Sequence, residues 1–331
     1  MNNETRKETQ VLPKDVRYVG ADDLTLPLFE NQYPVQPMGV SYNSYLILDE
    51  KIAVMDSVDA RAADEWLAKL AHELDGRSPD YLVISHMEPD HSGSILRLAE
   101  KYQEMKLVGN TKTFTMLRQF FGAKAPTDDR LLEVGEGETL PLGAHTLHFM
   151  LAPMVHWPEV MVAYEETEKL LFSADAFGRF GSLGRTANAP WAPQARRYYY
   201  NIVGKYGAQV QALLKKASAL EIKTVCPLHG PVLTGEALGE ALRLYDLWSR
   251  WQSESPDDIL LAHASIHGNT ARAAELFKQK LEAKGARVTL CDLTTTEVSY
   301  AVANAFYCGK LVLACSTYDG GLFPPMEEFL S

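Results

Sequence analysis

Short apolar runs rich in β-branched and aromatic residues recur through the first 230 residues, and polar or turn residues close each of them. Such runs predict β-strands. They lie at residues 16–19, 40–48, 52–56, 81–84, 107–109, 131–134, 146–150, 170–173 and 224–228. Apolar positions at helical spacing lie between them and predict helices at residues 60–74, 94–102, 113–121, 195–219 and 236–252. We therefore expect this part of the chain to form an α/β domain.

The pattern changes after the short polar segment 253–258, which contains a proline and follows a long predicted helix. Strands predicted at 259–264, 287–292 and 310–315 then alternate with helices predicted at 271–284 and 298–306. Near-continuous apolar strands separated by helices indicate a parallel sheet covered on both faces. We expect two domains, residues 1–255 and 256–331. The second has three strands where such a sheet usually has about five, so we expect it to be incomplete.

Side chains that can bind metal ions gather where the predicted strands of the first domain end. Four of them fall within six consecutive positions directly after the strand at 81–84, and three more each close another short apolar segment. The seven residues are His86, Glu88, Asp90, His91, His156, Asp175 and His229. Strand ends on one edge of a sheet converge in space, so we expect these side chains to build one site. The plainer alternative for the first four is a polar loop without a metal.

Seven candidate ligands are too many for one ion but suit two, provided that one carboxylate bridges them. We choose Asp175 as the bridge because it stands alone between the His156 and His229 segments. Carboxylate-rich sites that also contain imidazole favour iron or manganese, whereas all-histidine terminal ligation favours zinc. Asp56 is either a helix-start residue or a residue that supports a ligand. The remaining candidates are expected to be solvated or packed: His72, His145 and His148.

A second candidate site lies in the second domain, in a loop between a predicted strand and a helix N-terminus. Hydroxyls, a glycine and backbone N–H groups at the positive end of a helix can cradle an anion. The loop consists of Ser265, Ile266, His267, Gly268, Asn269 and Thr270. A second loop follows the strand at 310–315 and contains Ser316, Thr317, Tyr318, Asp319 and Gly320. No Walker lysine follows Gly268, so a small singly phosphorylated cofactor fits better than a nucleoside triphosphate; an ordinary helix capped by Thr270 is the alternative.

Composition and charge narrow the class of protein. The net charge of −11 argues against a broad nucleic-acid surface, because phosphate binding needs clustered lysine and arginine. No run of about 18 apolar residues exists, so no membrane-spanning helix is expected. Residues 1–7 are polar and lack the apolar core of a secretion signal. The four cysteines form no CxxC pair, which fits a reducing cytoplasm.

The ligand pattern resembles that of flavodiiron proteins. It begins as His86-x-Glu88-x-Asp90-His91 and continues with His156, Asp175 and His229. The resemblance covers nearly the whole chain, and it implies an αββα metallo-β-lactamase-like sandwich followed by a partial flavodoxin-like doubly wound parallel sheet. It also implies that His86, Glu88 and His156 hold one iron, that Asp90 and His229 hold the other, and that Asp175 bridges. The position of His91 is not always coordinated within the family.

The resemblance further implies reduction of dioxygen to water, of nitric oxide to nitrous oxide, or of both. FMN would supply the electrons, with its phosphate at residues 265–270 and its ring near residues 316–320. The family typically forms head-to-tail homodimers or dimers of dimers. A rubredoxin-like protein is the usual donor, and it would be a separate chain because no rubredoxin-like cysteine pairs occur here. The chain ends at Ser331 before the family's third flavin-contacting loop, so FMN retention stays open.

Two other functions remain as alternatives. One is a binuclear zinc hydrolase, but hydrolytic relatives usually carry histidine where this chain has Glu88. The other is a redox-sensing module without catalytic activity. Three consecutive tyrosines, Tyr198, Tyr199 and Tyr200, could bring a phenol near the metals. We prefer the interpretation that they pack on the core as one helix face.

Overall fold

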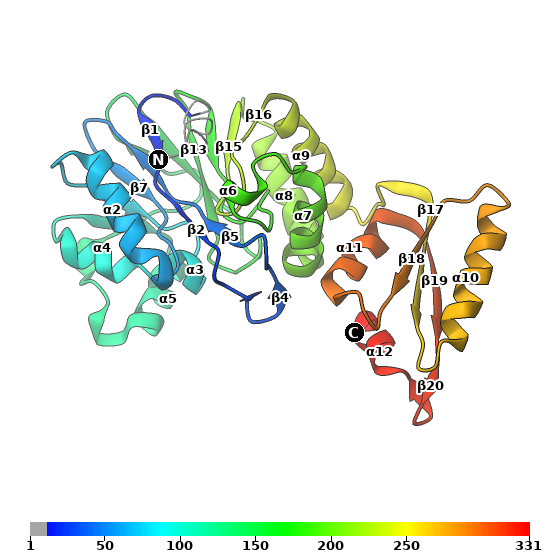
Figure 1. Ribbon diagram of the computed structural model, residues 1–331. Coiled ribbons are helices and arrows are strands. Elements are labelled where there is room, and N and C mark those ends of the chain that lie inside the picture. Colours follow the sequence, from blue (N-terminus) through cyan, green and yellow to red (C-terminus); the bar gives the residue numbers. More distant parts are fainter. Residues whose placement is uncertain (1–11) are drawn as a thin grey trace.

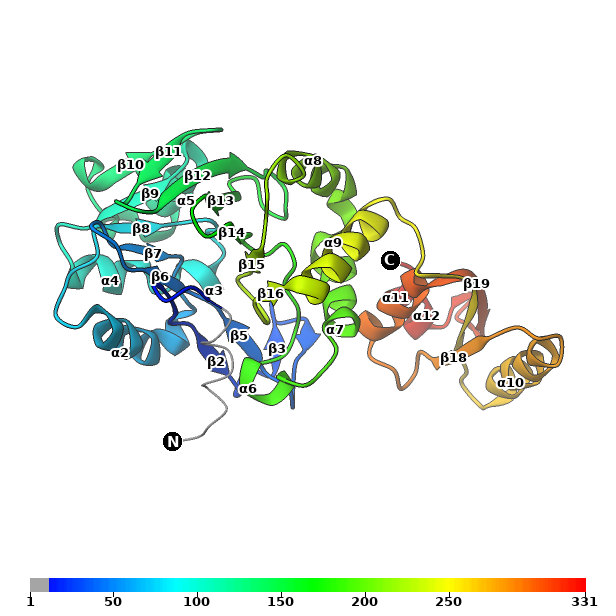
Figure 2. The same ribbon diagram turned by 90° about the horizontal axis from the view of Figure 1, so that it is seen from above.

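The computed structural model describes residues 12–331, so the prediction drawn from residues 1–7 lies outside the described range. The described chain forms a larger body built on two six-stranded sheets and a smaller one formed by residues 255–331 (Figure 1). The view from above shows the same separation (Figure 2). None of the helices within residues 12–331 is both long and apolar enough to cross a membrane.

The first sheet has the order β1-β6-β7-β8-β9-β10, in which β7 to β10 run parallel. β1 and β6 are antiparallel to their neighbours. The strands are β1 (Val16–Tyr18), β6 (Tyr45–Ile47), β7 (Ala53–Met55), β8 (Tyr81–Val83), β9 (Lys106–Gly109) and β10 (Leu131–Glu133).

The second sheet has the order β11-β12-β13-β14-β15-β16. Only the β14–β15 pair is parallel. The strands are β11 (Thr139–Pro141), β12 (Thr146–Leu151), β13 (Met161–Glu165), β14 (Leu170–Phe172), β15 (Thr224–Cys226) and β16 (Leu233–Thr234).

The two sheets face each other across a core whose members alternate along the strands. Met55, Val83, Phe149 and Phe172 lie between the sheets, whereas the neighbouring Val54 and Leu82 face the outer helices. This is the period of two expected for strands buried on both faces. The layers are therefore helix, sheet, sheet, helix (Figures 1 and 2).

Helices cover the outer faces of the two sheets. Those beside the first sheet are α2 (Ala63–Leu74), α4 (Ile95–Lys101) and α5 (Thr111–Phe121). Those beside the second sheet are α7 (Trp191–Tyr198), α8 (Gly207–Ala217) and α9 (Gly235–Ser249). Short elements complete this body: β2 (Ala21–Asp23) with β5 (Val40–Tyr42), β3 (Leu28–Phe29) with β4 (Tyr33–Pro34), α3 (Pro89–Ser92), α6 (Leu183–Thr186), and the 3₁₀ turns η1 (Ala60–Ala62), η2 (Gly122–Lys124), η3 (Asp128–Arg130) and η5 (Gly204–Tyr206).

The smaller body contains the predicted parallel sheet, in the order β18-β17-β19. Helix α10 lies on one side of it, and α11 and α12 lie on the other (Figure 1). Its own core includes Leu260, Ala262, Ala301 and Phe329. The elements are β17 (Ser255–Ala264), α10 (Asn269–Glu282), β18 (Val288–Asp292), α11 (Val298–Tyr307), β19 (Cys308–Cys315), β20 (Thr317–Tyr318), β21 (Gly321–Leu322) and α12 (Pro324–Leu330).

Two predicted elements are broken in the structure. The single strand expected at 40–48 is two strands, β5 and β6, which belong to different sheets. The helix expected at 195–219 is α7, a π-helical turn at Tyr199–Val203, a 3₁₀ turn and α8. Glycines at 204 and 207 favour that break, and a Cβ at Gly207 would lie 2.5 Å from the carbonyl oxygen of Ser249. Tight packing of α8 on α9 therefore requires glycine there.

Three further details differ from the prediction. Asp90 and His91 lie in the short helix α3 and not in an irregular loop. Strand β13 was not predicted. β17 begins at Ser255, so the polar segment expected to link two domains is largely the first part of a strand.

Candidate metal centre

The seven predicted ligands converge at one end of the two-sheet sandwich. His86 and Glu88 follow β8, Asp90 and His91 lie in α3, and the other three follow β12, β14 and β15. They form two groups, and within each group the ligand atoms lie within 4.8 Å of one another. The first group is His86, Glu88, His156 and Asp175, and the second is Asp90, His91 and His229.

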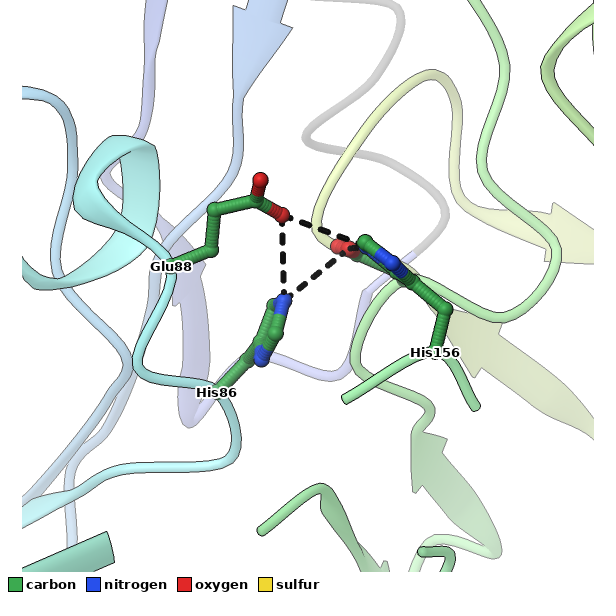
Figure 3. Close-up of side chains that lie close together, drawn as sticks. His86, Glu88 and His156 are labelled. Carbon is green, nitrogen blue, oxygen red and sulfur yellow. Dashed lines mark hydrogen bonds and ion pairs between the residues drawn. The ribbon is translucent and has the colours of Figure 1, made fainter. Parts of the chain in front are cut away.

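In the first group, one carboxylate oxygen of Glu88 lies between two imidazoles (Figure 3). Glu88 Oε2 is 3.2 Å from His86 Nε2 and 3.2 Å from His156 Nε2. Asp175 Oδ2 faces the same two nitrogens, at 3.4 Å and 3.2 Å. Two oxygens and two nitrogens thus surround one point, as ligands of a metal ion do.

The second group is arranged around a close pair of imidazoles. His91 Nε2 and His229 Nε2 are 3.1 Å apart, and Asp90 Oδ2 lies 3.3 Å and 3.2 Å from them. The second oxygen of Asp175, Oδ1, is 3.2 Å from His91 Nε2. Asp175 therefore presents one oxygen to each group, which is the geometry of a bridging carboxylate. His91 lies among these side chains, although the resemblance left its coordination open.

The donor set fits cations. His91, His229 and Asp175 are fully buried, and both oxygens of Asp90 are buried without a hydrogen-bond partner among residues 12–331. Buried polar atoms of native proteins are almost always paired, because leaving them unpaired is costly. A cation between Asp90 and the two imidazoles would satisfy both carboxylate and ring lone pairs. Ligation by these residues nevertheless stays a prediction.

The pKa shifts of the clustered side chains also indicate that the buried carboxylates are stabilised by positive charge. Burial disfavours a charged His156, but the carboxylates of Asp175 and Glu88 outweigh it and raise the pKa of His156 to about 9. Burial likewise opposes ionisation of Asp175, yet the surrounding histidines hold its pKa well below the usual value. Protons on imidazoles balance the carboxylates when no cation does, so metal binding must displace them.

Glu159 orients His86 and was not singled out from the sequence. Its Oε1 accepts hydrogen bonds from His86 Nδ1 at 2.7 Å and from the Met87 backbone N–H at 2.8 Å. With Nδ1 occupied in this way, the Nε2 of His86 faces Glu88 and Asp175 of the first group. The only signal in the sequence was a carboxylate three residues after His156.

Replacing Glu159 by glutamine should weaken metal binding by about 10- to 100-fold, which is the usual cost of losing a partner of a ligating histidine. Competition with a chelator measures this. The matched control is Glu165→Gln, because Glu165 is also a buried carboxylate 3.0 Å from a histidine, His145, but lies outside both ligand groups. Equal losses in the two variants would show that Glu159 acts only through stability.

Asp56 and Asn43 hold the two ligand-bearing loops. Burial raises the pKa of Asp56 to about 6, and its Oδ1 accepts from the backbone N–H of Ser85 at 2.7 Å. Asp56 therefore supports the His86 loop and does not start a helix. Asn43 Nδ2 donates to the carbonyls of Pro227 and Gly230 at 2.8 and 2.7 Å. These bonds fix the turn that carries His229 and explain why the strand breaks between β5 and β6.

The three consecutive tyrosines do not share one environment. The Tyr198 ring lies 5.6 Å from the His229 ring, and its buried hydroxyl has no hydrogen-bond partner within the described range. The rings of Tyr199 and Tyr200 pack near Trp248, at 5.4 and 6.0 Å. The prediction of packing on the core is correct for all three, and Tyr198 also lies beside His229 of the candidate ligands.

The weaker histidine candidates lie outside both ligand groups. His145 is buried against Glu165, and His148 Nε2 is 2.8 Å from Glu166 on the surface. His72 belongs to the last turn of α2 and has an exposed side chain. Packing and solvation account for all three.

The predicted cofactor loops of the smaller body lie side by side. Residues 265–270 connect β17 to α10, and residues 316–320 follow β19. Thr270 Oγ1 and Ser316 Oγ are 3.1 Å apart, and the Ser265 hydroxyl is buried without a partner in the described chain. Gly268 has φ +80, and a Cβ there would meet no atom within 4 Å. The loops thus form an open polar cradle at the start of α10.

A family model described as ODP family beta lactamase matches residues 40–230, more than half of the chain, including all seven candidate ligands. The chain belongs to the ODP family. The crystal structure of the flavodiiron protein from Giardia intestinalis matches it with a TM-score of 0.89 and 28% identity, covering 96% of this chain and 78% of that one. The predicted fold class is therefore confirmed.

Named relatives of this ODP-family chain agree with the resemblance to flavodiiron proteins. It is 29% identical to the rubredoxin-oxygen oxidoreductase of Megalodesulfovibrio gigas, over 92% of this chain and 77% of the relative. It is 26% identical to the nitric oxide reductase of Moorella thermoacetica, over 95% of this chain and 79% of the relative. The chain spans about half the length of the diflavin flavoproteins that it also matches. The resemblance to flavodiiron proteins is confirmed.

Proposed function

We propose that the chain is a di-iron oxidoreductase that reduces dioxygen to water, nitric oxide to nitrous oxide, or both. The observation that carries this proposal is Asp175, whose two oxygens face two separate groups of ligand-type side chains. The names of the relatives from Megalodesulfovibrio gigas and Moorella thermoacetica support the two substrates. Two bound iron ions would supply open coordination positions and electrons for a diatomic gas.

The donor set favours iron over zinc. Glu88, Asp90 and Asp175 contribute carboxylate oxygens beside the imidazoles, and mixed carboxylate–imidazole sets suit iron and manganese. We assign His86, Glu88 and His156 to one ion, Asp90, His91 and His229 to the other, and Asp175 to both. A pocket of about 810 Å³ opens over Glu88, Asp90 and His156, which gives a small gas access to the ions.

We propose that the second domain, residues 256–331, binds FMN and that residues 1–255 form the metal domain. The phosphate would lie on the cradle at the start of α10, where backbone dipoles favour anions. The unpartnered Ser265 hydroxyl and the Thr270–Ser316 pair support this placement. The residues assigned to FMN are Ser265, Ile266, His267, Gly268, Asn269, Thr270, Ser316, Thr317, Tyr318, Asp319 and Gly320.

The remaining proposals concern partners and location. A rubredoxin-like protein would supply electrons, as the name of the relative from Megalodesulfovibrio gigas suggests. A head-to-tail homodimer, or a dimer of two such dimers, would bring the flavin of one subunit to the open metal pocket of the other. A reducing compartment such as the cytoplasm agrees with the four cysteines, all of which are free.

Loading the metal-free protein with ferrous iron under anaerobic conditions should give about two irons per chain and consumption of dioxygen or nitric oxide from a reduced donor. Elemental analysis and gas electrodes measure both. The zinc-loaded protein should consume neither gas, because zinc has no redox chemistry. An iron form that consumes neither gas, beside a zinc form that rapidly hydrolyses thioesters or lactams, would instead establish the hydrolase alternative.

A further inference from the structure

The β3–β4 hairpin forms one wall of the pocket over the candidate metal ligands. Residues 28–33 of this hairpin line the pocket, together with Glu88, Asp90 and His156. Its tip consists of Glu30 and Asn31, both with positive φ, as the tight turns of short hairpins require. Each strand is only two residues long, and such a short two-stranded ribbon is marginal by itself. Contacts from outside must hold it in place.

Arg197 supplies one of these contacts. Its side chain is fully buried, and one guanidinium nitrogen donates to the carbonyl of Pro34 in β4 at 2.8 Å. The other polar contacts of the guanidinium are with the start of α11 in the second domain. Nε donates to Ser299 Oγ at 2.6 Å, a terminal nitrogen donates to Tyr300 Oη at 3.2 Å, and Glu297 Oε2 lies at 3.3 Å.

Aromatic rings from both domains also contact the guanidinium. The Tyr300 ring of the second domain lies 4.0 Å from it, and the Phe180 ring of the first domain lies 4.7 Å from it. A guanidinium that donates hydrogen bonds from its edge and stacks against aromatic rings is held in one orientation. A lysine ammonium cannot make this set of contacts. Arg197 therefore ties the hairpin to α11 rigidly.

A second chain of hydrogen bonds runs parallel to the first. Tyr33 of the hairpin donates from its hydroxyl to the Asn201 carbonyl at 3.0 Å. Asn201 Nδ2 donates in turn to the carbonyls of Arg197 at 2.7 Å and Ser299 at 3.2 Å. Tyr33 and Asn201 both line the metal pocket. In Figure 1, α7 and α11 lie beside each other where the two bodies meet.

We propose that Arg197 is a positioning residue through which the second domain holds the β3–β4 hairpin against the metal pocket. The geometry of the pocket wall then depends on the seating of α11, although no residue of α11 lines that pocket. This inference rests on the proposed function in one respect, because it treats the pocket as the entrance for substrate. The position of the wall can be measured whatever the reaction.

Hydrogen–deuterium exchange of the metal-loaded full chain tests the proposal directly. In Arg197→Met, amides of residues 27–36, such as Val35 N–H bonded to Pro27, should exchange at least about fivefold faster than in the unsubstituted protein. Amides of α5 should keep their protection. Azide, used as a small anionic probe, should associate at least about threefold faster with the loaded centre at unchanged metal content.

Arg196→Met is the matched control. Arg196 also contacts the second domain, through the Tyr307 ring at 4.5 Å. It pairs with Glu254 of the first domain at 2.5 Å, and none of these contacts is with the hairpin. Its hairpin amides should exchange at the normal rate. Equal loosening in both variants, or no loosening in Arg197→Met, would overturn the proposal.

A double variant covers the case in which Arg197→Met does not fold. Ser299→Ala with Tyr300→Phe removes contacts only on the second domain and leaves Glu297 beside the guanidinium. Faster exchange of the hairpin in this variant would establish that α11 holds the wall. Normal exchange would show that the hydrogen bonds of Arg197 to Ser299 and Tyr300 do not hold the wall, and would overturn the proposal. If the unsubstituted iron-loaded protein reduces neither gas while the hairpin still loosens in Arg197→Met, the proposed function is wrong and the role of Arg197 in positioning the hairpin stands.

Discussion

Alanine at position 175 should remove both metal ions and gas reduction together. Asp175 is fully buried and is the one side chain within residues 12–331 whose two oxygens face both ligand groups. Without it, each group loses an anionic ligand and the charge that draws the two cations together. We expect metal content to fall from about two ions per chain to well below one, and the rate to fall by on the order of 10³-fold or more. Elemental analysis after gel filtration and gas-consumption rates measure these losses.

Two further variants make the result specific to the bridge. Asp175→Asn keeps the volume of the side chain and one oxygen, so a loss of the second ion there reflects lost ligation and not lost packing. Asp64→Ala removes an exposed carboxylate with a surface partner, Arg97, and should bind metal normally. If Asp175→Ala retained both ions, the two groups would be independent sites, and the binuclear proposal would be wrong.

The convergence of the candidate ligands could be predicted because most of them directly follow strands, and strands are recognisable in the sequence from their apolar runs. His86, His156, Asp175 and His229 needed only the rule that strand ends on one edge converge. Glu159 and Asn43 followed no such rule. Glu159 acts across 73 positions on His86, and Asn43 acts across 187 positions on Gly230. Hydrogen bonds between sheets leave no period in the sequence.

The fold could be predicted to a similar degree, and where its prediction failed there was a physical reason. The parallel order of β17, β18 and β19 followed from apolar strands separated by helices. β13 was missed because all five of its residues are buried, so it shows no alternation and begins soon after Trp157 and Pro158. A short continuous apolar run does not distinguish strand from helix.

The three tyrosines lie at a local break in the helix and have different neighbours. An uninterrupted helix would point consecutive residues about 100° apart, and only one of them could face the ligands. Tyr198 is the last residue of α7 and its ring approaches His229, whereas the π-helical turn that begins at Tyr199 carries the next two rings to Trp248. π-helical turns recur at functional sites. Nothing in the periodicity of residues 195–219 indicated where this turn would lie.

Replacing Phe149 by alanine should destabilise the metal-free protein by about 3–5 kcal/mol, the usual cost of removing a buried phenylalanine. Phe149 has no exposed surface and lies in the core between the two sheets. The substitution leaves a cavity that neither sheet can close without moving. Because His86 follows a strand of one sheet and Asp175 and His229 follow strands of the other, the ligand groups span that core. Urea unfolding of the metal-free protein measures the loss.

A phenylalanine-to-alanine substitution on the surface is the control, because it makes the same chemical change without removing a buried side chain. Phe120 in α5 is 44% exposed, and Phe120→Ala should change stability by no more than about 0.5 kcal/mol. Metal affinity should fall in Phe149→Ala but not in Phe120→Ala. In Phe149→Ala, part of the free energy of metal binding is used to restore the distance between the sheets. Unchanged affinity in a destabilised Phe149→Ala would show that the loops hold the ligands without the sandwich beneath them. The packing between the two sheets would then contribute to stability but not to metal affinity.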